Sequence, residues 1–310
     1  MTISDLLAEG YTFYRQPEQA RIDCPEMRLL EDHLWRLADL LEGLDTSGSS
    51  SSVAVDSSSG EWPRIAQWLR MGAGLRYVDV DLAYGNQDPI LCRTAADAEA
   101  AANDTASLDA TELTRLQYTW NSVERLLQVC RLPSVPAAPG RFNAATMLLK
   151  VYWSERELPA HYSCVLRHLR AHVDNDPDLR GQDRLRTALK EAPWRGPSGV
   201  LLAAANQLRH LPAHGDVTIA EPATWGEEES AEACRFPVHL HAARLAARGL
   251  ALSVQMLLIA TEAPFVLTGW REPTDGWWVL NDDRWQQTLD ASAVKLLEQA
   301  HLQPPEFDLS

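Results

Sequence analysis

One short stretch of the chain carries an arginine and two histidines within six residues. It runs from Asn206 to Asp216 and contains Arg209, His210 and His214. Cleavage of RNA requires a base that takes the proton of a 2′-hydroxyl, an acid that protonates the departing 5′-oxygen, and a group that stabilises negative charge on the phosphorane. Histidine titrates near neutral pH and arginine stays charged, so these residue types suit the three tasks without a metal ion.

The elements around this stretch decide whether its side chains can act together. An apolar run over 199–209 predicts a buried helix. Pro212 ends it, because proline lacks an N–H donor and disfavours helix at the preceding residue. Residues five apart on a straight helix face different ways, whereas a turn lets Arg209 and His214 converge on one phosphate. A simpler interpretation stays open, in which Arg209 and His210 only offset the negative end of the helix dipole and His214 lies in an ordinary turn.

The stretch resembles the signature of the HEPN superfamily, in which an arginine and a polar residue are followed, after three residues, by a histidine. Arg209 and His210 fill the first two places, and Ala213, His214 and Gly215 form the end. Many members of that superfamily are metal-independent ribonucleases. The resemblance implies that Arg209 orients or stabilises the phosphate, that His214 is the general acid or base, and that His210 holds the polar place beside the arginine.

The resemblance also implies partners and further contacts. Two protomers of the family commonly pair around a shared groove, so it implies a homodimer acting on RNA, with no cofactor. Polar residues on the first helix of the family often point at the site, and Asn121 and Glu124 are the candidates. The long helix after the signature is expected to bring His241, Arg244 and Arg248 to the RNA backbone. By spacing alone, these three residues could equally form one solvated helix face.

The bulk charge limits how RNA could bind. A formal net charge of -15 opposes broad affinity for nucleic acid, because such affinity depends on neutralising phosphates with Lys and Arg. Any RNA contact must therefore be local. The basic residues nearest the signature do cluster, over Arg235 to Arg248, but an acidic loop at 221–232 precedes them.

No metal, disulfide framework or membrane segment is predicted. The five cysteines are odd in number and scattered, which favours a reducing cytoplasm. Asp79 and Asp81 share a face of a predicted strand, but no third ligand is fixed by spacing. The N-terminus has no secretory signal, and the apolar stretch Gly249–Ala260 is too short to span a bilayer, so a soluble cytoplasmic protein is expected.

Helical spacing of apolar residues predicts a mainly α fold with a small mixed α/β N-terminal region and a short C-terminal β-hairpin plus helix. The family resemblance implies that the helices form a HEPN-like antiparallel bundle. The predicted helices span about 26–44, 61–70, 110–131, 142–153, 155–174, 179–192, 199–209, 238–262 and 291–301. Alternation over 75–84 predicts a strand, and 265–270 with 276–280 predict the hairpin.

Composition divides the chain into three parts. Residues 1–108 form the N-terminal mixed region, 109–264 the HEPN-like helical domain, and 265–310 the C-terminal hairpin and helix. The Ser/Gly run at 45–60 is expected to be a mobile loop, since it can bury little apolar surface. The stretch 94–109, rich in Ala, Asp, Asn and Thr, indicates the first boundary.

Two classes of function follow. The first is a metal-independent endoribonuclease that leaves a 2′,3′-cyclic phosphate, in a prokaryotic toxin or antiviral defence role, with a neutralising or activating protein partner. The alternative is a non-catalytic dimeric adaptor or sensor that binds a protein or nucleotide ligand, which the net charge and the acidic loop favour. The tryptophans near the C-terminus, among them Trp277 and Trp278, either stack bases or close a small core under the hairpin.

Overall fold

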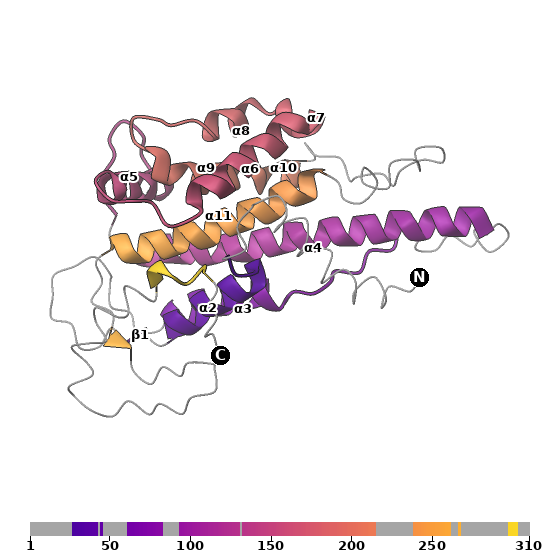
Figure 1. Cartoon of the computed structure of the whole chain (residues 1–310), viewed down its shortest axis with the longest axis horizontal. Coiled ribbons are helices and arrows are strands. Elements are labelled where there is room, and N and C mark those ends of the chain that lie inside the picture. The colour runs from indigo at the N-terminus through magenta and orange to yellow at the C-terminus, as the bar shows by residue number, and fades with distance from the viewer. Residues whose placement is uncertain are drawn as a thin grey trace, which may run out of the picture.

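The structure is a computed structural model, and it describes residues 27–42, 44–45, 61–82, 93–130, 132–214, 238–261, 266–267 and 297–302. Over these ranges the protein is mainly helical, which confirms the coarse fold class. The two longest helices, α4 (Arg93–Val129) and α11 (Val238–Ala260), run side by side through the middle of the molecule (Figure 1). Helices α2 (Leu30–Glu42) and α3 (Glu61–Gly74) lie on one side of this pair.

The remaining helices cover the other side of α11. They are α5 (Arg141–Trp153), α6 (Tyr162–Asn175), α7 (Pro177–Arg180), α8 (Asp183–Ala188), the 3₁₀ turn η2 (Pro197–Gly199), α9 (Val200–Leu208) and α10 (His210–His214). Of these, α5, α6 and α9 pack directly against α11. The predicted helix over 155–174 begins only at Tyr162, after Pro159, and the one over 179–192 is two short helices.

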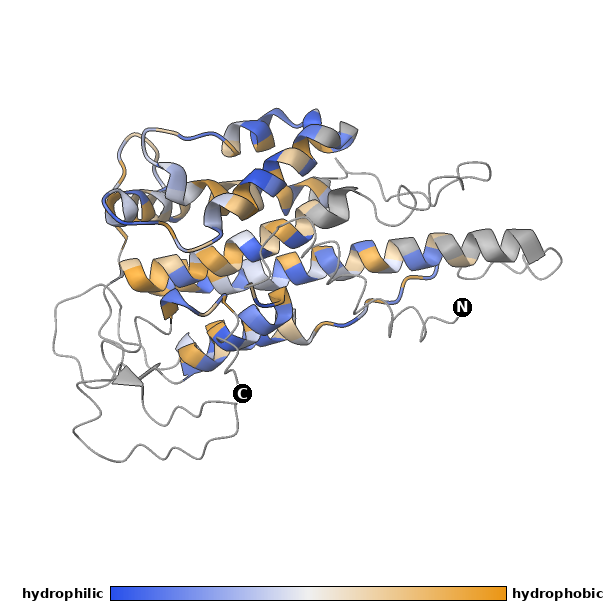
Figure 2. Cartoon of the chain, viewed as in Figure 1, coloured by the Kyte–Doolittle hydropathy of each residue, from blue (hydrophilic) through white to orange (hydrophobic). Residues whose placement is uncertain are grey.

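Helix α11 is the centre of the core. Every described side chain from Ala242 to Ala260 is buried, as expected for a helix that is apolar on nearly all sides (Figure 2). Gly249 lets α9 approach closely, since a Cβ there would lie 3.1 Å from the Cβ of Leu201. The 19 residues Ala242–Ala260 are long and apolar enough to cross a bilayer, which corrects the expectation that this stretch is too short. They are wholly buried inside the fold, as the core helix of a soluble protein also is.

Helix α4 is longer than predicted, because the polar stretch at 94–109 is helical. One helix of 37 residues therefore runs across the expected boundary at 108/109. The main hydrophobic cluster likewise joins side chains on both sides of it, from Met27 and Leu69 to Leu126 and Leu258. The described core shows no break at this point, and the three-part division stays a prediction.

The predicted strand over 75–84 is wrong for the described residues 75–82, which are extended but pair with no strand there. Instead, this segment runs along α4, and its alternate backbone N–H groups donate to polar side chains four residues apart on the helix. The three bonds are Val78 to Thr111 Oγ1 (2.8 Å), Val80 to Ser107 Oγ (2.9 Å) and Leu82 to Asn103 Oδ1 (2.9 Å). Two extended residues cover about 6.6 Å and four helical residues about 6 Å, so the two periods match.

The only described strand pair is β1 (Leu44–Asp45) with β2 (Val266–Leu267), antiparallel, with Leu44 opposite Leu267. Asp45, the second residue of β1, is the first residue of the predicted Ser/Gly loop at 45–60. Residues 46–60 are outside the described residues. The second strand of the predicted C-terminal hairpin, 276–280, is also outside them. Of the predicted terminal helix the structure describes only its end, where Met27 and Leu302 form an isolated bridge.

We predict that Thr111→Val destabilises the fold by about 1–3 kcal/mol. Valine keeps the shape of threonine but removes the oxygen that accepts the Val78 N–H, and an unpaired amide is costly to bury. Urea denaturation measures the change. Thr114→Val is the matched control, because Thr114 is on the same helix and no hydrogen bond of its side chain is seen among the described residues. Equal stability of the two variants would contradict this account of the extended segment.

Candidate active site

The stretch with the arginine and the histidines lies where two helices meet. The buried helix α9 ends at Leu208, and Arg209 is its C-cap, with helical dihedral angles of -64° and -23°. The backbone N–H of Arg209 still donates to the carbonyl of Ala205 at 3.1 Å. The short helix α10 then starts at His210 and contains Pro212 in its first turn, where the missing N–H of proline costs little. The expected turn is therefore a break between two helices.

Arg209 is held in place by contacts from two helices. Its Cζ atom lies 4.2 Å from the centroid of the Trp120 ring of α4, and its Nε atom donates to Asn206 Oδ1 at 3.1 Å. Partial burial lowers the pKa of Arg209, and the carboxylate of Glu124 opposes that shift. Among the described residues, no hydrogen bond to either Nη atom is seen. The guanidinium is thus oriented by the protein while its outer edge can still bind an anion.

The two histidines follow directly. His210 is half-buried at the start of α10 and has interaction partners of its own. The backbone of His214 ends the same helix, but its side chain is outside the described residues. His214 thus follows Arg209 by five residues, at the end of α10. The distance between the His214 imidazole and the Arg209 guanidinium is not part of the described structure.

Helix α4 supplies the other wall of this site. Glu124 is exposed and close enough to Arg209 for its charge to act on the guanidinium. Asn121 is half-buried, and its Oδ1 accepts a hydrogen bond from Gln117 Nε2 at 2.9 Å, so it is not joined to Arg209 by a described contact. Trp120, whose ring supports the guanidinium, was not predicted as a site residue. Its spacing of four residues from Glu124 places both on one face of the helix and is the signal that points to it.

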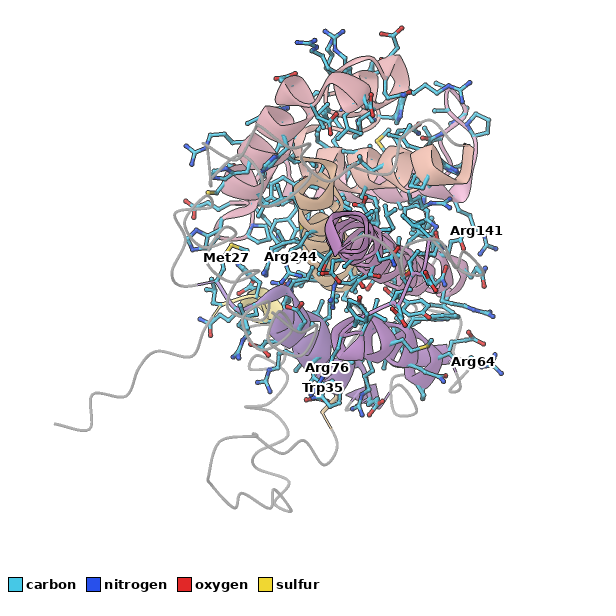
Figure 3. The ribbon with its side chains drawn as sticks, turned by 90° about the vertical axis from the view of Figure 1, so that its right-hand side faces the viewer. Met27, Trp35, Arg64, Arg76, Arg141 and Arg244 are labelled. Carbon is cyan, nitrogen blue, oxygen red and sulfur yellow. The ribbon has the colours of Figure 1, made fainter. Side chains whose placement is uncertain are left out.

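Arg244 and Arg248 do not line this site. Both are buried, with exposed fractions of 4% and 1%. Arg244 binds two carboxylates, with Nη2 2.9 Å from Glu31 Oε2 and Nη1 3.2 Å from Glu112 Oε1. Figure 3 shows Arg244 among the helices, whereas Arg64 and Arg141 extend from the surface. The expectation that Arg244 and Arg248 contact an RNA backbone is therefore wrong, because water and RNA do not reach them. The side chain of His241 is outside the described residues.

Arg244 belongs to a buried cluster of four charges that joins three helices. Arg115 of α4 lies 3.4 Å from Glu31 and 3.3 Å from Glu112, so each arginine contacts both carboxylates. Burial raises the pKa of Glu31, but the guanidiniums of Arg244 and Arg115 outweigh it and hold that pKa far below its usual value. The cluster has two positive and two negative charges, which is the condition under which charges tolerate burial.

A second buried polar cluster ties the C-terminal segment to the core. Gln255 of α11 lies between two histidines, with its Oε1 3.2 Å from His33 Nε2 and its Nε2 3.1 Å from His301 Nδ1. His301 Nε2 lies 3.0 Å from the carbonyl of Ala160. Gln255 Nε2 also donates to the carbonyl of Glu298, which orients the amide, so His301 Nδ1 must accept and His33 Nε2 must donate. The first bond requires a neutral His301. Burial lowers the pKa of His301 to about 4 and that of His33 well below its usual value, and nearby Arg248 adds to both shifts.

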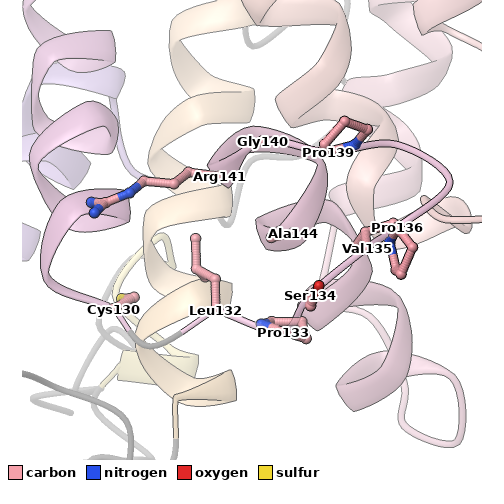
Figure 4. Close-up of a pocket in the computed structure, with 10 residues that line it drawn as sticks. All are labelled: Cys130, Leu132, Pro133, Ser134, Val135, Pro136, Pro139, Gly140, Arg141 and Ala144. Atoms are coloured by element: carbon pink, nitrogen blue, oxygen red, sulfur yellow. The ribbon is translucent and has the colours of Figure 1, made fainter.

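Cys130, which lines a hollow, is another described group that could do chemistry. A hollow of about 460 Å³ is lined by the loop over 132–140, by Cys130 and by Arg141 (Figure 4). Burial raises the pKa of the Cys130 thiol to about 12, so it is not a thiolate nucleophile at neutral pH. Within the described ranges, no three His, Cys, Asp or Glu side chains gather as metal ligands.

Comparisons with protein-family models, with curated proteins and with solved structures each found no match to this chain. The support for a function therefore comes from the residues and their geometry.

We predict that the protein loses stability as the pH falls from about 6.5 towards 4. In the unfolded chain His301 takes up a proton below about pH 6.5, whereas the folded protein keeps it neutral until about pH 4. Its contribution is complete above pH 6.5, and about 2 kcal/mol of it is lost between pH 7 and pH 5. Urea denaturation at the two pH values measures this, and His301→Gln should shrink the difference. Equal stability of the wild type at both pH values contradicts the prediction.

Proposed function

We propose that this chain is a metal-independent endoribonuclease of the HEPN type, acting in the cytoplasm with Arg209 and His214 at its active site. The observation that supports it best is the state of Arg209. Its guanidinium is oriented by the Trp120 ring and by Asn206, yet no described residue binds its Nη atoms. Core arginines of this chain, such as Arg115 and Arg244, are instead bound by two carboxylates. An oriented but uncommitted cation suits a site that receives a phosphate.

The proposed reaction is an in-line transfer at phosphorus. A base removes the proton of the 2′-hydroxyl, the 2′-oxygen forms a bond to phosphorus, and the bond from phosphorus to the 5′-oxygen breaks as an acid protonates that oxygen. The products are a 2′,3′-cyclic phosphate and a 5′-hydroxyl, and no electrons are exchanged with a cofactor. His214 is the general acid or base, and Arg209 neutralises the charge of the phosphorane. His210 is the polar residue that follows the arginine in the signature.

The local character of the site fits the charge of the chain. With a net charge of -15, the protein cannot hold RNA along a broad surface, so recognition has to concentrate near Arg209. A homodimer, in which a second copy of the site faces the first, would supply the second histidine for the two proton transfers. We place the activity in a toxin or antiviral defence role, where a protein partner would control it.

The test is cleavage of end-labelled single-stranded and structured RNAs by purified protein in EDTA. We predict that the wild type cuts under these conditions and that His214→Ala lowers the rate about a hundredfold or more, because general acid–base catalysis has at least that effect. His168→Ala, a histidine of α6 outside the proposed site, is the matched control and should cut at the wild-type rate. The fragments should carry 5′-hydroxyl and cyclic phosphate ends.

Two results would overturn the ribonuclease proposal. One is equal cleavage by the wild type and His214→Ala, which would mean that a contaminant or another site cuts. The other is the absence of cleavage in EDTA for every RNA tested.

The second candidate function is a non-catalytic dimeric adaptor or sensor that binds a protein or nucleotide ligand. The burial of Arg244 and Arg248 favours it, because it removes two cations from the surface that RNA would meet. On that candidate the protein would form a dimer in sedimentation experiments and would bind its ligand equally well as the wild type and as His214→Ala.

A further inference from the structure

A groove of about 390 Å³ opens between the start of α5, helix α8 and helix α9. Arg209 does not line it but is hydrogen-bonded to Asn206, which does. The lining of the groove includes two aromatic rings, Phe142 and Trp194, and three amides, Asn143, Asn206 and Gln207. All five side chains are half-buried, so each presents part of its surface to the groove. The volume lies in the range of small-molecule sites, and the lining of rings with a few polar groups is typical of them.

The sequence of α9 builds one wall of this groove. Ala203, Asn206 and Gln207 are spaced by three and four residues, which places them on one face of the helix. The opposite face of α9 carries Leu201 and Leu208 into the core. Ala188 lines the groove from α8, and small side chains such as Ala188 and Ala203 leave room for a ligand to enter.

Two chains of contacts join the groove to Arg209. Asn206, which lines the groove, accepts the hydrogen bond of Arg209 Nε at 3.1 Å. Phe142, which also lines it, lies 6.2 Å from Trp120 between ring centroids, and Trp120 supports the guanidinium. A ligand in the groove would therefore lie next to the cation that we assign to the phosphate.

The charges on the rim decide which part of a nucleotide the groove would hold. Asp183 and Arg184 are both exposed at its edge and carry opposite charges. The third charged lining residue, Arg195, is buried, and its Nη2 atom already donates to the carbonyls of Thr187 and Lys190, so the groove presents no exposed excess of positive charge to a phosphate. The amide of Gln207 has no hydrogen-bonding partner among the described residues, and it can donate and accept at once. The groove therefore suits a flat, uncharged group with both donors and acceptors.

We propose that this groove is a subsite for an unstacked nucleobase of single-stranded RNA, next to the phosphate that Arg209 would bind. The base stacks on the exposed parts of Trp194 and Phe142, and the Gln207 amide bonds its edge. Adenine fits this arrangement well, since a glutamine amide pairs with its N6 and N7 atoms through two hydrogen bonds. This inference rests on the proposed function, because it names the substrate feature read at that site.

The experiment measures binding apart from cleavage. The probe is a fluorescently labelled decamer of adenosine with 2′-O-methyl groups, which lacks the 2′-hydroxyl nucleophile and cannot be cut. Fluorescence anisotropy gives the Kd for the full chain and for two variants, Trp194→Ala and Gln207→Leu. Leucine keeps the size and helix propensity of glutamine but removes the amide. We expect Kd to rise about tenfold in each variant. Circular dichroism confirms that both are folded.

The matched control is Trp35→Ala. Trp35 is a partly exposed tryptophan of α2 that contacts Arg70 and does not line the groove. The Trp35→Ala variant should bind the decamer with a Kd within about twofold of the wild type. This control separates loss of the subsite from a general effect of removing a tryptophan.

The outcomes distinguish this inference from the ribonuclease proposal. If the wild type does not bind the decamer, or if either folded variant binds it as tightly as the wild type, the subsite is wrong. If the wild type cuts RNA in EDTA while both variants bind the decamer normally, the ribonuclease proposal stands and only the proposed subsite is wrong. If both variants lose binding but no RNA is cut, the subsite stands and the protein binds RNA without cleaving it.

Discussion

The position of the three central helices depends on the buried cluster of Glu31, Glu112, Arg115 and Arg244. Each arginine contacts both carboxylates at distances from 2.9 to 3.4 Å, so α2, α4 and α11 can approach only in a geometry that keeps all four charges paired. Arg115 also donates to the carbonyls of Gly72 and Leu75, where α3 ends and the extended segment begins. Loss of any one charge would leave two buried like charges to share a single partner, and such an uncompensated charge is costly to bury. The cluster thereby sets where the later turns of α4 lie.

Those later turns carry Trp120, whose ring lies against the Arg209 guanidinium, and Glu124, whose charge acts on it. The protein thus uses its arginines in two ways. Arg115 and Arg244 are neutralised inside the core, whereas Arg209 is oriented by an aromatic ring and an amide, and no residue that the structure describes bonds its Nη atoms. In a chain with a net charge of -15, Arg209 differs from these two buried arginines in being oriented at the surface of the helices without a described carboxylate bound to its Nη atoms. On the ribonuclease proposal, Arg209 and the groove of rings and amides beside it would receive one nucleotide rather than a long stretch of RNA.

The helices could be predicted from the sequence because their apolar spacing is local information. The charge cluster could not be predicted, since Arg244 is 213 residues from Glu31 and 132 from Glu112. In the sequence, an arginine buried in an apolar helix also looks the same as an arginine on a solvent-exposed helix face. The extended segment over 75–82 has the alternation of a strand, but its partners are Asn103, Ser107 and Thr111 of a helix. The first two lie in the polar stretch 94–109, which had indicated a boundary. The stretch from Arg209 to His214 was found from its residue types, whereas its support by Trp120 became visible only in the fold.

The division between core and site arginines is tested most directly by comparing Arg209→Gln with Arg244→Gln, each assayed for RNA cleavage in EDTA and for stability in urea. We predict that Arg209→Gln lowers cleavage about a hundredfold or more while the free energy of unfolding changes by no more than about 1 kcal/mol. Arg244→Gln should lose about 3–5 kcal/mol of stability, because it leaves two buried carboxylates to share the single positive charge of Arg115. Full cleavage by Arg209→Gln, together with a stable but inactive Arg244→Gln, would contradict the account.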